Sequence, residues 1–542
     1  MTLAVVLVTE AVGGESEPGP AAELPYGPAA TLLERLLDQL ASLNVPDSRV
    51  IARREIAAPL RKNGFDVIET DGLDDDLRVI SALARATERP MLILHGDIVA
   101  SNELLTRVVH DSKGAATAVI SRRWPGEAPV RPVVRTGPAG IVSAGSRYHQ
   151  VTEPDAVFQG VLRVAPSTAR TLADVADELA ALSGTLTEVT PVRIRAGAAR
   201  NDAADDLAGA LSVAPVPVLA ITPPRGDDVP ALLLTGLVRA GVRVSTCGAR
   251  ELVCERALTE EQAAAARAAV DAVDEDRVRL AAAVKSDDGF FTTYAVSSYS
   301  WLITRWAARR GLTPNMVTSI SMGIAVVAAI WFAAGTRIGM IVGALLLYVA
   351  FVLDCVDGQL ARYTRQFSTL GAWLDATFDR AKEYVAYAGL AVGSTAAAVG
   401  GAVHGGNVWR LAVGAMAVQT CRHMVDFAFG AARRRPGGAA ALPVLPLSTP
   451  DDGALDPPPD VQQRGRGGGP GRFAVALSNR TEQVPGLRWA KKIVILPIGE
   501  RFALISLSAA LFNAKVTFIL LLGWGLLATA YTLAGRVLRS IA

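Results

Sequence analysis

The sequence predicts two domains of different class: an N-terminal α/β domain and a C-terminal all-α bundle of six transmembrane helices. Charged residues are spread through roughly the first 285 positions, whereas long runs after Thr313 are nearly free of charge. The N-terminal half also alternates strand-like and helix-like segments, an order that builds a mostly parallel sheet flanked by helices. The chain has 542 residues, 51% of them hydrophobic, and a formal net charge of +2. This balance gives no argument for nucleic-acid binding, and the length indicates more than one domain.

The N-terminal elements follow one another in βαβα order. The first apolar run lacks a basic flank and ends in acids, so it is expected to be a strand and not a signal peptide. The run PMLILHGDI reads as a buried strand that ends at Asp97. Four cysteines without C-x-x-C spacing are expected to be free thiols in a reducing compartment, with no zinc site. We expect strands at 2–9, 49–53, 65–69, 90–98 and 160–164, and helices at 30–43, 74–87 and 259–284.

The C-terminal half is dominated by apolar helices. Residues 294–310 carry two tryptophans and three arginines, a pattern typical of a helix lying on a membrane surface. Pro314 can start the next helix. Residues 433–485, rich in Pro, Gly and charge, are expected to be a disordered cytoplasmic loop. Six spans are predicted, at about 316–334, 338–354, 408–430, 502–513 and 516–534, with the third running from the aspartate motif described below to about 403.

Basic residues cluster at one set of helix ends, as in Arg433, Arg434 and Arg435. The positive-inside rule therefore predicts a multi-pass protein of the cell (inner or plasma) membrane, with both termini and the α/β domain in the cytoplasm. The expected domains are 1–258 (α/β), 259–312 (connecting and interfacial helices) and 313–542 (membrane domain).

Four aspartates stand where one apolar run ends and the next begins. Asp354 and Asp357 are three residues apart, and Asp375 and Asp379 are four apart, so each pair shares one helix face. Charge at the edge of a membrane span is expensive and indicates function. Two such faces opposed would give a cage of hard oxygens suited to Mg²⁺ or Mn²⁺ bridging phosphates. Three small residues keep the space between the helices open: Gly358, Ala361 and Gly371.

The full pattern is D-x2-D-G-x2-A-R-x8-G-x3-D-x3-D. It resembles the signature of the CDP-alcohol phosphotransferases, membrane enzymes that join a CDP-activated alcohol to an acceptor alcohol and release CMP. The resemblance implies a two-metal site held by Asp354, Asp357, Asp375 and Asp379, with Asp379 as the general base toward the acceptor hydroxyl. Helix caps and surface charges are the alternative for these acids. The resemblance also implies membrane lipids as partners and a homodimer, the common form of such enzymes. It further implies a CDP-alcohol site lined by Gly358, Ala361, Arg362, Gly371, Asn315 and Thr318.

Two further arginines could bind an anionic acceptor such as a phosphorylated polyol. Arg422 lies within the fourth span and Arg501 opens the fifth. An ion pair between Arg422 and Asp426, or a flanking role for Arg501, is an equal alternative. Helix capping by Asn315 and an ordinary flanking role for Arg362 likewise stay open.

The N-terminal half is similar to Rossmann-like nucleotidyltransferases of sugar nucleotides, in which an Asp after a hydrophobic strand binds metal. Together the two halves resemble bifunctional enzymes that fuse an inositol-phosphate cytidylyltransferase to a di-inositol-phosphate-phosphate synthase. Here, however, acids such as Glu10 and Glu15 follow the first strand in place of a G-x-G-x-R loop and its lysine. Acids would repel a triphosphate, so we expect a degenerate, non-catalytic domain.

Three functions remain. The first is a CDP-alcohol phosphotransferase of phospholipid or polyol-phosphodiester biosynthesis, with a non-catalytic α/β domain. The second is a bifunctional enzyme that also makes its CDP-alcohol from CTP. The third is a membrane-anchored binding protein with a vestigial site. The intact motif argues against the third function, and the missing G-x-G-x-R loop and lysine argue against the second.

Overall fold

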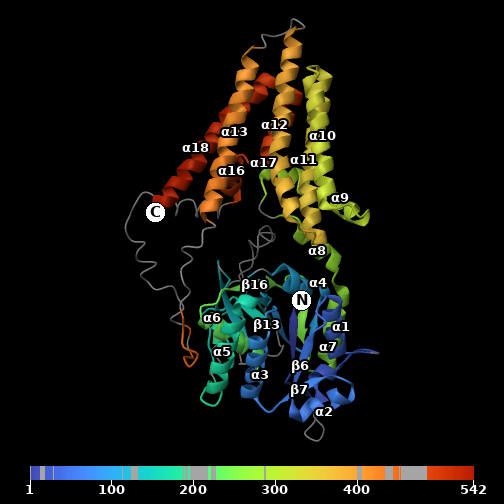
Figure 1. Cartoon of the computed structure of the whole chain (residues 1–542), viewed down its shortest axis with the longest axis vertical. Helices are drawn as coiled ribbons and strands as arrows, with labels where there is room; N and C mark the ends of the chain where they lie inside the picture. The colour runs from blue at the N-terminus through green and yellow to red at the C-terminus, as the bar shows by residue number, and fades with distance from the viewer. Residues whose placement is uncertain are drawn as a thin grey trace. The chain divides into compact units, whose positions relative to one another are not determined.

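The computed structural model divides the chain into two compact units, which are described separately. The α/β unit comprises Met1–Glu275 and Ala439–Gln462, and the membrane unit comprises Asp276–Gly438 and Gln463–Ala542. Figure 1 shows the sheet-containing and helical units in one cartoon. The structure describes residues 2–541 except 13–18, 29, 113, 124–131, 139, 187, 189–192, 196–217, 221–227, 286–287, 400–405, 434–443, 451 and 453–484.

A nine-stranded sheet of order β10-β16-β12-β11-β13-β8-β1-β6-β7 forms the core of the α/β unit. Strands β1, β6, β7 and β8 pair in parallel, as the sequence predicts. The prediction of a mostly parallel sheet is wrong for the other half, where β13 runs antiparallel to β8, β10 and β11. The strands are β1 (Leu3–Val8), β6 (Ser48–Arg53), β7 (Val67–Thr70), β8 (Met91–His95), β10 (Ala116–Ser121), β11 (Val133–Gly137), β12 (Gly140–Ala144), β13 (Ala156–Val164) and β16 (Val244–Gly248).

Helices cover the sheet and bury its apolar side chains. A cap fixes the start of the first helix, because Thr31 and Glu34 each accept a hydrogen bond from the other's backbone N–H. One continuous core joins the sheet to α3, α5 and α6, which Figure 1 draws near one another. The helices are α1 (Leu32–Ser42), α2 (Arg54–Lys62), α3 (Leu73–Ala86), α4 (Asn102–Thr106), α5 (Ala169–Leu182), α6 (Val229–Arg239) and α7 (Glu260–Ala272).

Two sequence predictions need correction here. The single helix expected over 259–284 is two helices, α7 and α8 (Glu275–Ala283), because the chain is non-helical at Val273 and Asp274. The strand expected over 90–98 ends at His95, and a short strand β9 (Ile98–Ala100) pairs instead with β17 (Cys254–Arg256). Asp97 therefore lies in the turn between β8 and β9.

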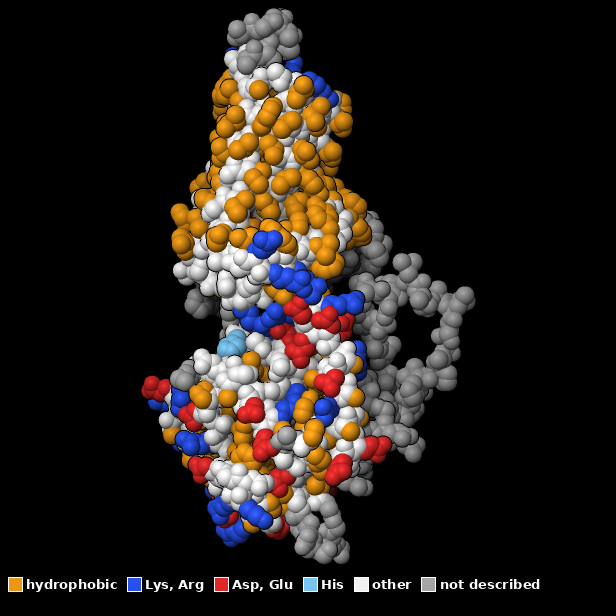
Figure 2. Space-filling view, turned by 90° about the vertical axis from the view of Figure 1, so that its right-hand side faces the viewer, with side chains coloured by type: hydrophobic (Ala, Val, Ile, Leu, Met, Phe, Trp, Pro, Cys, Tyr) orange, Lys and Arg blue, Asp and Glu red, His pale blue; other side chains and the backbone are white. Residues whose placement is uncertain are grey.

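The membrane unit is helical and presents many large hydrophobic side chains on its surface, including Ile330, Leu345, Val413 and Leu507. Figure 2 shows this surface dominated by hydrophobic side chains, whereas charged side chains are scattered over the α/β unit. The helices are α9 (Ser297–Arg309), α10 (Pro314–Ala333), α11 (Arg337–Thr364), α12 (Thr369–Val399), α13 (Gly406–Arg433), α16 (Pro485–Ile495), α17 (Ile498–Leu511) and α18 (Ala514–Ile541).

Helices cover most of the described part of each range predicted as a span, but these helices are not equally apolar. Within the described residues, three helices are long and apolar enough to cross a membrane: α10, α11 and most of α18. A fourth crossing arises if α16 and α17, bent by 71° at their junction, are one broken span. Helix α12 carries charged residues in its N-terminal half and α13 carries them at several positions, so a bundle of six spans stays a proposal.

Small residues let the first helices of this unit pack closely. A Cβ added to Gly389 of α12 would lie 2.4 Å from the Ala329 carbonyl oxygen of α10, and one on Gly393 would lie 2.0 Å from that of Phe332. Backbones this close tolerate no side chain at the crossing point. This close packing sets α12 against α10 near the face that carries the aspartates.

Most of the loop predicted to be disordered lies outside the described residues. The exceptions are residues 444–450 and Asp452, which belong to the α/β unit and pack on it. Leu447 is only 3% exposed and Asp452 only 1%. The structure thus differs from the prediction here, because buried apolar and hydrogen-bonded side chains order this stretch.

Candidate active site

The C-terminal part of α11 and the first turns of α12 bring three aspartates together. Carboxylate oxygens of Asp354, Asp357 and Asp375 all lie within 4.8 Å of one another. Asp357 is buried and Asp375 is exposed, so the cluster has one open side. Three hard oxygen donors converging at this distance fit a divalent cation such as Mg²⁺ or Mn²⁺. The opposed helix faces expected from the spacing are present.

The turn between the two helices produces this arrangement. Arg365 adopts a left-handed conformation (φ 56°) that ends α11, and the Ser368 hydroxyl accepts a hydrogen bond from the Gly371 amide at 2.8 Å near the start of α12. From α10, the Thr318 hydroxyl donates to Asp357 Oδ2 at 2.6 Å. The reversal of the chain therefore sets the two acidic faces opposite each other, and α10 orients the most buried carboxylate.

The two glycines of the motif differ in their surroundings. A Cβ on Gly371 would lie 2.7 Å from Asn315 Oδ1, so the amide of Asn315 already fills the space above it. A Cβ on Gly358 would meet only the guanidinium of Arg362, at 3.3 Å. Arg362 itself donates from Nε to the Ala283 carbonyl at 2.5 Å. Gly371 is thus closely covered by the Asn315 side chain, whereas Gly358 borders space that only the Arg362 side chain approaches.

Sequence reasoning missed a cation inside the acidic cluster. The Lys382 ammonium contacts Asp354 and lies 3.9 Å from Asp379 Oδ1, and the side chain is 1% exposed. A buried cation offsets part of the repulsion between neighbouring carboxylates. The sequence signal for this contact is the position of Lys382 one helical turn after Asp379, which places the two side chains on one helix face. Lys382 links Asp354 and Asp379, so the fourth aspartate belongs to the same charged network.

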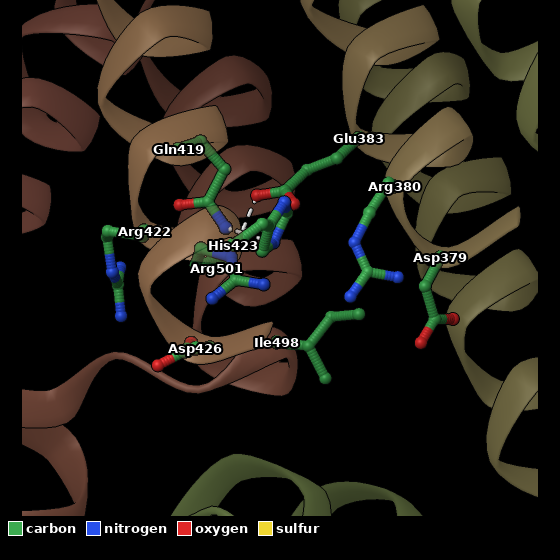
Figure 3. A pocket seen from close by; sticks show the side chains of 9 residues that line it. All are labelled: Asp379, Arg380, Glu383, Gln419, Arg422, His423, Asp426, Ile498 and Arg501. Atoms are coloured by element: carbon green, nitrogen blue, oxygen red, sulfur yellow. Dashed lines mark hydrogen bonds and ion pairs between the residues drawn. The ribbon is translucent and has the colours of Figure 1, made fainter. Parts of the chain in front are cut away.

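A cavity of about 200 Å³ opens beside Asp379. Figure 3 shows Arg422 and Arg380 on opposite sides of it, with Arg501 between them. Arg501 donates to the buried carboxylate of Glu383 at 2.8 Å, a pair that the sequence analysis did not anticipate. The cavity is lined from α12, α13 and α17 by Asp379, Arg380, Glu383, Gln419, Arg422, His423, Asp426, Ile498 and Arg501.

The guanidinium groups of this cavity are not all neutralised by acids. Arg422 donates to the Ile495 carbonyl at 2.8 Å, while Asp426, the alternative partner considered for it, pairs with Arg536. Among the described residues, Arg422 Nη1 and Arg380 Nε are buried without a hydrogen-bond partner. Buried unsatisfied donors on cationic groups call for an acceptor. The cavity therefore suits an anion.

The α/β unit has its own buried charged centre around Asp97. The Arg256 guanidinium donates two hydrogen bonds to this carboxylate, from Nε to Oδ1 at 2.9 Å and from Nη2 to Oδ2 at 2.7 Å. It also lies 3.7 Å from Glu10 and 4.0 Å from Asp228. Burial lowers the pKa of Arg256, but the charge of Asp97 and its hydrogen bonds outweigh this and raise it. The Arg256 guanidinium thus occupies the carboxylate oxygens that Asp97 would need to bind a metal.

Comparisons with known proteins agree with the geometry of the membrane unit. Residues 311–442 match the family model described as CDP-alcohol phosphatidyltransferase. The chain is 35% identical over 91 residues to an archaetidylinositol phosphate synthase of Pyrococcus horikoshii, a match that spans 17% of this chain and 47% of that relative's length.

Solved structures add similarities at low identity. They include the inositol-1-phosphate CTP transferase from T. maritima (12% identity, TM-score 0.33, 50% of this chain and 96% of that chain). They also include a putative glucose-1-phosphate thymidylyltransferase from Bacillus anthracis (12% identity, TM-score 0.32, 51% of this chain and 97% of that chain). The family match covers the stretch that holds all four aspartates. Residues 311–442 therefore form a region that matches the CDP-alcohol phosphatidyltransferase family, whose members are transferases of substituted phosphate groups.

Proposed function

We propose that this protein transfers a substituted phosphate group from a CDP-alcohol to an acceptor alcohol and releases CMP. The observation that carries the proposal is the convergence of Asp354, Asp357 and Asp375 next to a cationic cavity, with Asp379 on the boundary between them. A nucleotide pyrophosphate can lie at the acids while an anionic acceptor occupies the cavity. Holding both reactants in contact converts a bimolecular reaction into an effectively unimolecular one.

The four aspartates take different roles in this proposal. Asp354, Asp357 and Asp375 would hold Mg²⁺ or Mn²⁺, and Asp379 would complete a two-metal site. When bound, the metal supplies positive charge to the pyrophosphate and to the leaving phosphate. Asp379 faces the acceptor cavity and receives the proton of the attacking hydroxyl. A bond forms between that oxygen and the β-phosphorus, and the bond from this phosphorus to the bridging oxygen breaks, so that CMP leaves.

The nucleotide site is proposed along the inner faces of α10, α11 and α12. Gly358 and Ala361 leave room for the pyrophosphate, and Thr318 orients Asp357. Asn315 lies over Gly371 and can offer its amide N–H to the nucleotide. Arg362 is held by a backbone carbonyl through Nε, which leaves its terminal nitrogens for phosphate.

For the acceptor we propose a phosphorylated polyol, with inositol phosphate as the first compound to test. Arg422 and Arg380 present buried donors without partners, and Arg501 is locked in place by Glu383. Guanidinium groups bind phosphate strongly because several N–H donors converge in one plane. The similarity to an archaetidylinositol phosphate synthase of Pyrococcus supports an inositol-type acceptor.

The α/β unit is proposed to be non-catalytic. Its metal-ligand candidate Asp97 is 3% exposed and doubly bonded to Arg256, which leaves its carboxylate engaged by a cation. This favours a single transferase over a bifunctional enzyme. We further propose a multi-pass location in the cell membrane with the termini and the α/β unit in the cytoplasm. A homodimer stays a prediction.

The experiment is a CMP-release assay on the purified full chain, with Mg²⁺, a panel of CDP-alcohols, and free or phosphorylated polyols. Asp354→Asn and Asp375→Asn should each abolish release, because the metal site loses a charged oxygen. Asp174→Asn, which removes one exposed carboxylate of the α/β unit, is the control and should retain full rate. Wild-type turnover by either cluster variant would refute the assignment. Pyrophosphate release from CTP would favour the bifunctional enzyme, and neither product would favour a vestigial site.

A further inference from the structure

The chain passes between its two units more often than two domains in series require. After the helices α8 to α13 of the membrane unit, residues 444–450 and Asp452, called the strap below, belong to the α/β unit, and the chain then goes back for α16, α17 and α18. The strap is held on the α/β unit by contacts with residues that lie some 200 to 300 positions earlier in the sequence.

The first half of the strap is held at the C-terminal end of α6. The Leu445 amide donates to the Arg239 carbonyl at 2.9 Å, and the Arg239 guanidinium donates back to the carbonyls of Pro446 (2.9 Å) and Thr449. Arg239 is only 2% exposed, and Leu447 inserts into the core beneath α5 and α6. A buried guanidinium whose hydrogen bonds go to strap carbonyls binds this backbone specifically.

The second half is held by a buried carboxylate. Asp452 accepts hydrogen bonds from the Ser143 hydroxyl at 2.5 Å, and from the amide and hydroxyl of Thr152 at 3.0 and 2.6 Å. Between these ends, His149 Nε2 lies 2.8 Å from the Leu447 carbonyl, and the Gln150 amide donates to Pro450 at 2.8 Å. The strap therefore uses both its backbone and its side chains, as an added edge segment of the unit would.

From these contacts we infer that the α/β unit is a receptor for this chain's own strap, and that the strap is a second anchor of the unit to the membrane helices. The first anchor is covalent, through Val273 and Asp274 between α7 and α8. The second is non-covalent and independent of the proposed reaction. Two attachments in one chain make each rebinding event intramolecular, so together they hold far more tightly than one.

The test separates the two anchors in the full-length protein. A protease recognition sequence is inserted between Val273 and Asp274, the non-helical pair that joins α7 to α8. Membranes containing the protein are cleaved and sedimented, and the α/β fragment is measured in the pellet and the supernatant. With the strap intact, the fragment should stay in the pellet. With Leu447→Asp combined with Asp452→Ala, the released fraction should rise about tenfold.

The controls keep the result interpretable. Asp174→Ala removes an acid of the same unit that pairs with exposed Arg85 and does not touch the strap, so it should retain the fragment. Hydrogen exchange of the β1 and β8 amides reports whether the α/β unit is folded. If the double variant unfolds, the single variant Asp452→Asn replaces it in the release assay. Release despite an intact strap, or equal retention after its disruption, would overturn the inference. Because neither readout involves CMP, failure of the proposed function would leave this result unchanged.

Discussion

Replacing Arg256 with alanine should selectively destabilise the α/β unit. The guanidinium is 16% exposed and its partner carboxylate on Asp97 is 4% exposed, with two hydrogen bonds between them. The turn after β8 fixes Asp97, and the pairing of β17 with β9 fixes Arg256, so neither can move to water without opening the sheet edge. Alanine would leave a buried carboxylate beside Glu10 and Asp228 with its main counter-charge gone.

The magnitude follows from this burial. Removing one partner of a buried ion pair costs about 3–5 kcal/mol, because the remaining charge stays desolvated and unpaired. At about 1.36 kcal/mol per tenfold change, the unfolded fraction of this unit should rise roughly a hundred- to several-thousand-fold. Removing both charges in Asp97→Asn with Arg256→Gln should cost clearly less than the sum of the single variants.

Pulse proteolysis in urea measures this on the full chain, since cleavage of the α/β unit reports its own unfolding. CMP release at low denaturant should stay near wild type in every variant, because the four aspartates lie in the other unit. A loss of stability below about 1 kcal/mol in Arg256→Ala would refute the reasoning. Such a value would mean that the pair is hydrated and that Asp97 is available to a metal after all.

Three further outcomes are expected. Gly389→Leu should destabilise the membrane unit in detergent by about 3 kcal/mol, because its Cβ would collide with a carbonyl of α10, whereas Gly430→Leu points into open space and should be neutral in the same melt. Arg422→Ala should raise KM for a phosphorylated acceptor roughly 10- to 100-fold, the equivalent of ~1.5–3 kcal/mol, and spare KM for the CDP-alcohol; equal effects on both substrates would assign Arg422 to packing. Burial lowers the pKa of His149 from 6.5 to about 4. The stability that the α/β unit draws from burying a neutral His149, about 3 kcal/mol, should therefore be complete above pH 6.5 and be lost as pH falls toward 4, a decline that hydrogen exchange of this unit's amides would show and that a flat profile would contradict.

The acidic cluster could be predicted from sequence because its geometry is local. Intervals of three and four residues fix which side chains share a helix face, and one tight turn then opposes the two faces. Lys382 and Glu383 were missed as partners, although they lie one turn further along α12. The helical position of a charged residue does not identify its partner on another helix. Glu383 meets Arg501 from a helix more than a hundred residues away.

Long-range pairing explains the other differences. Apolar strands look alike whether their neighbour is parallel or antiparallel, so the reversal at β11 and β12 was not visible. The Ala-rich run of α7 continues into α8 with helical spacing, which hid the break at Val273. The strap lies in a Pro-rich stretch whose composition indicates disorder, and only the buried partners Arg239 and Thr152 make it ordered.

The strap also constrains how the chain is threaded through the bilayer. Residues 1–275 and the strap fold together, so they occupy one compartment, and the chain between them must cross the membrane an even number of times. Helices α10 and α11 are apolar enough to account for two crossings. Parity then requires that α12 and α13, the charged pair that carries Asp375 and Arg422, either both cross or both stay out.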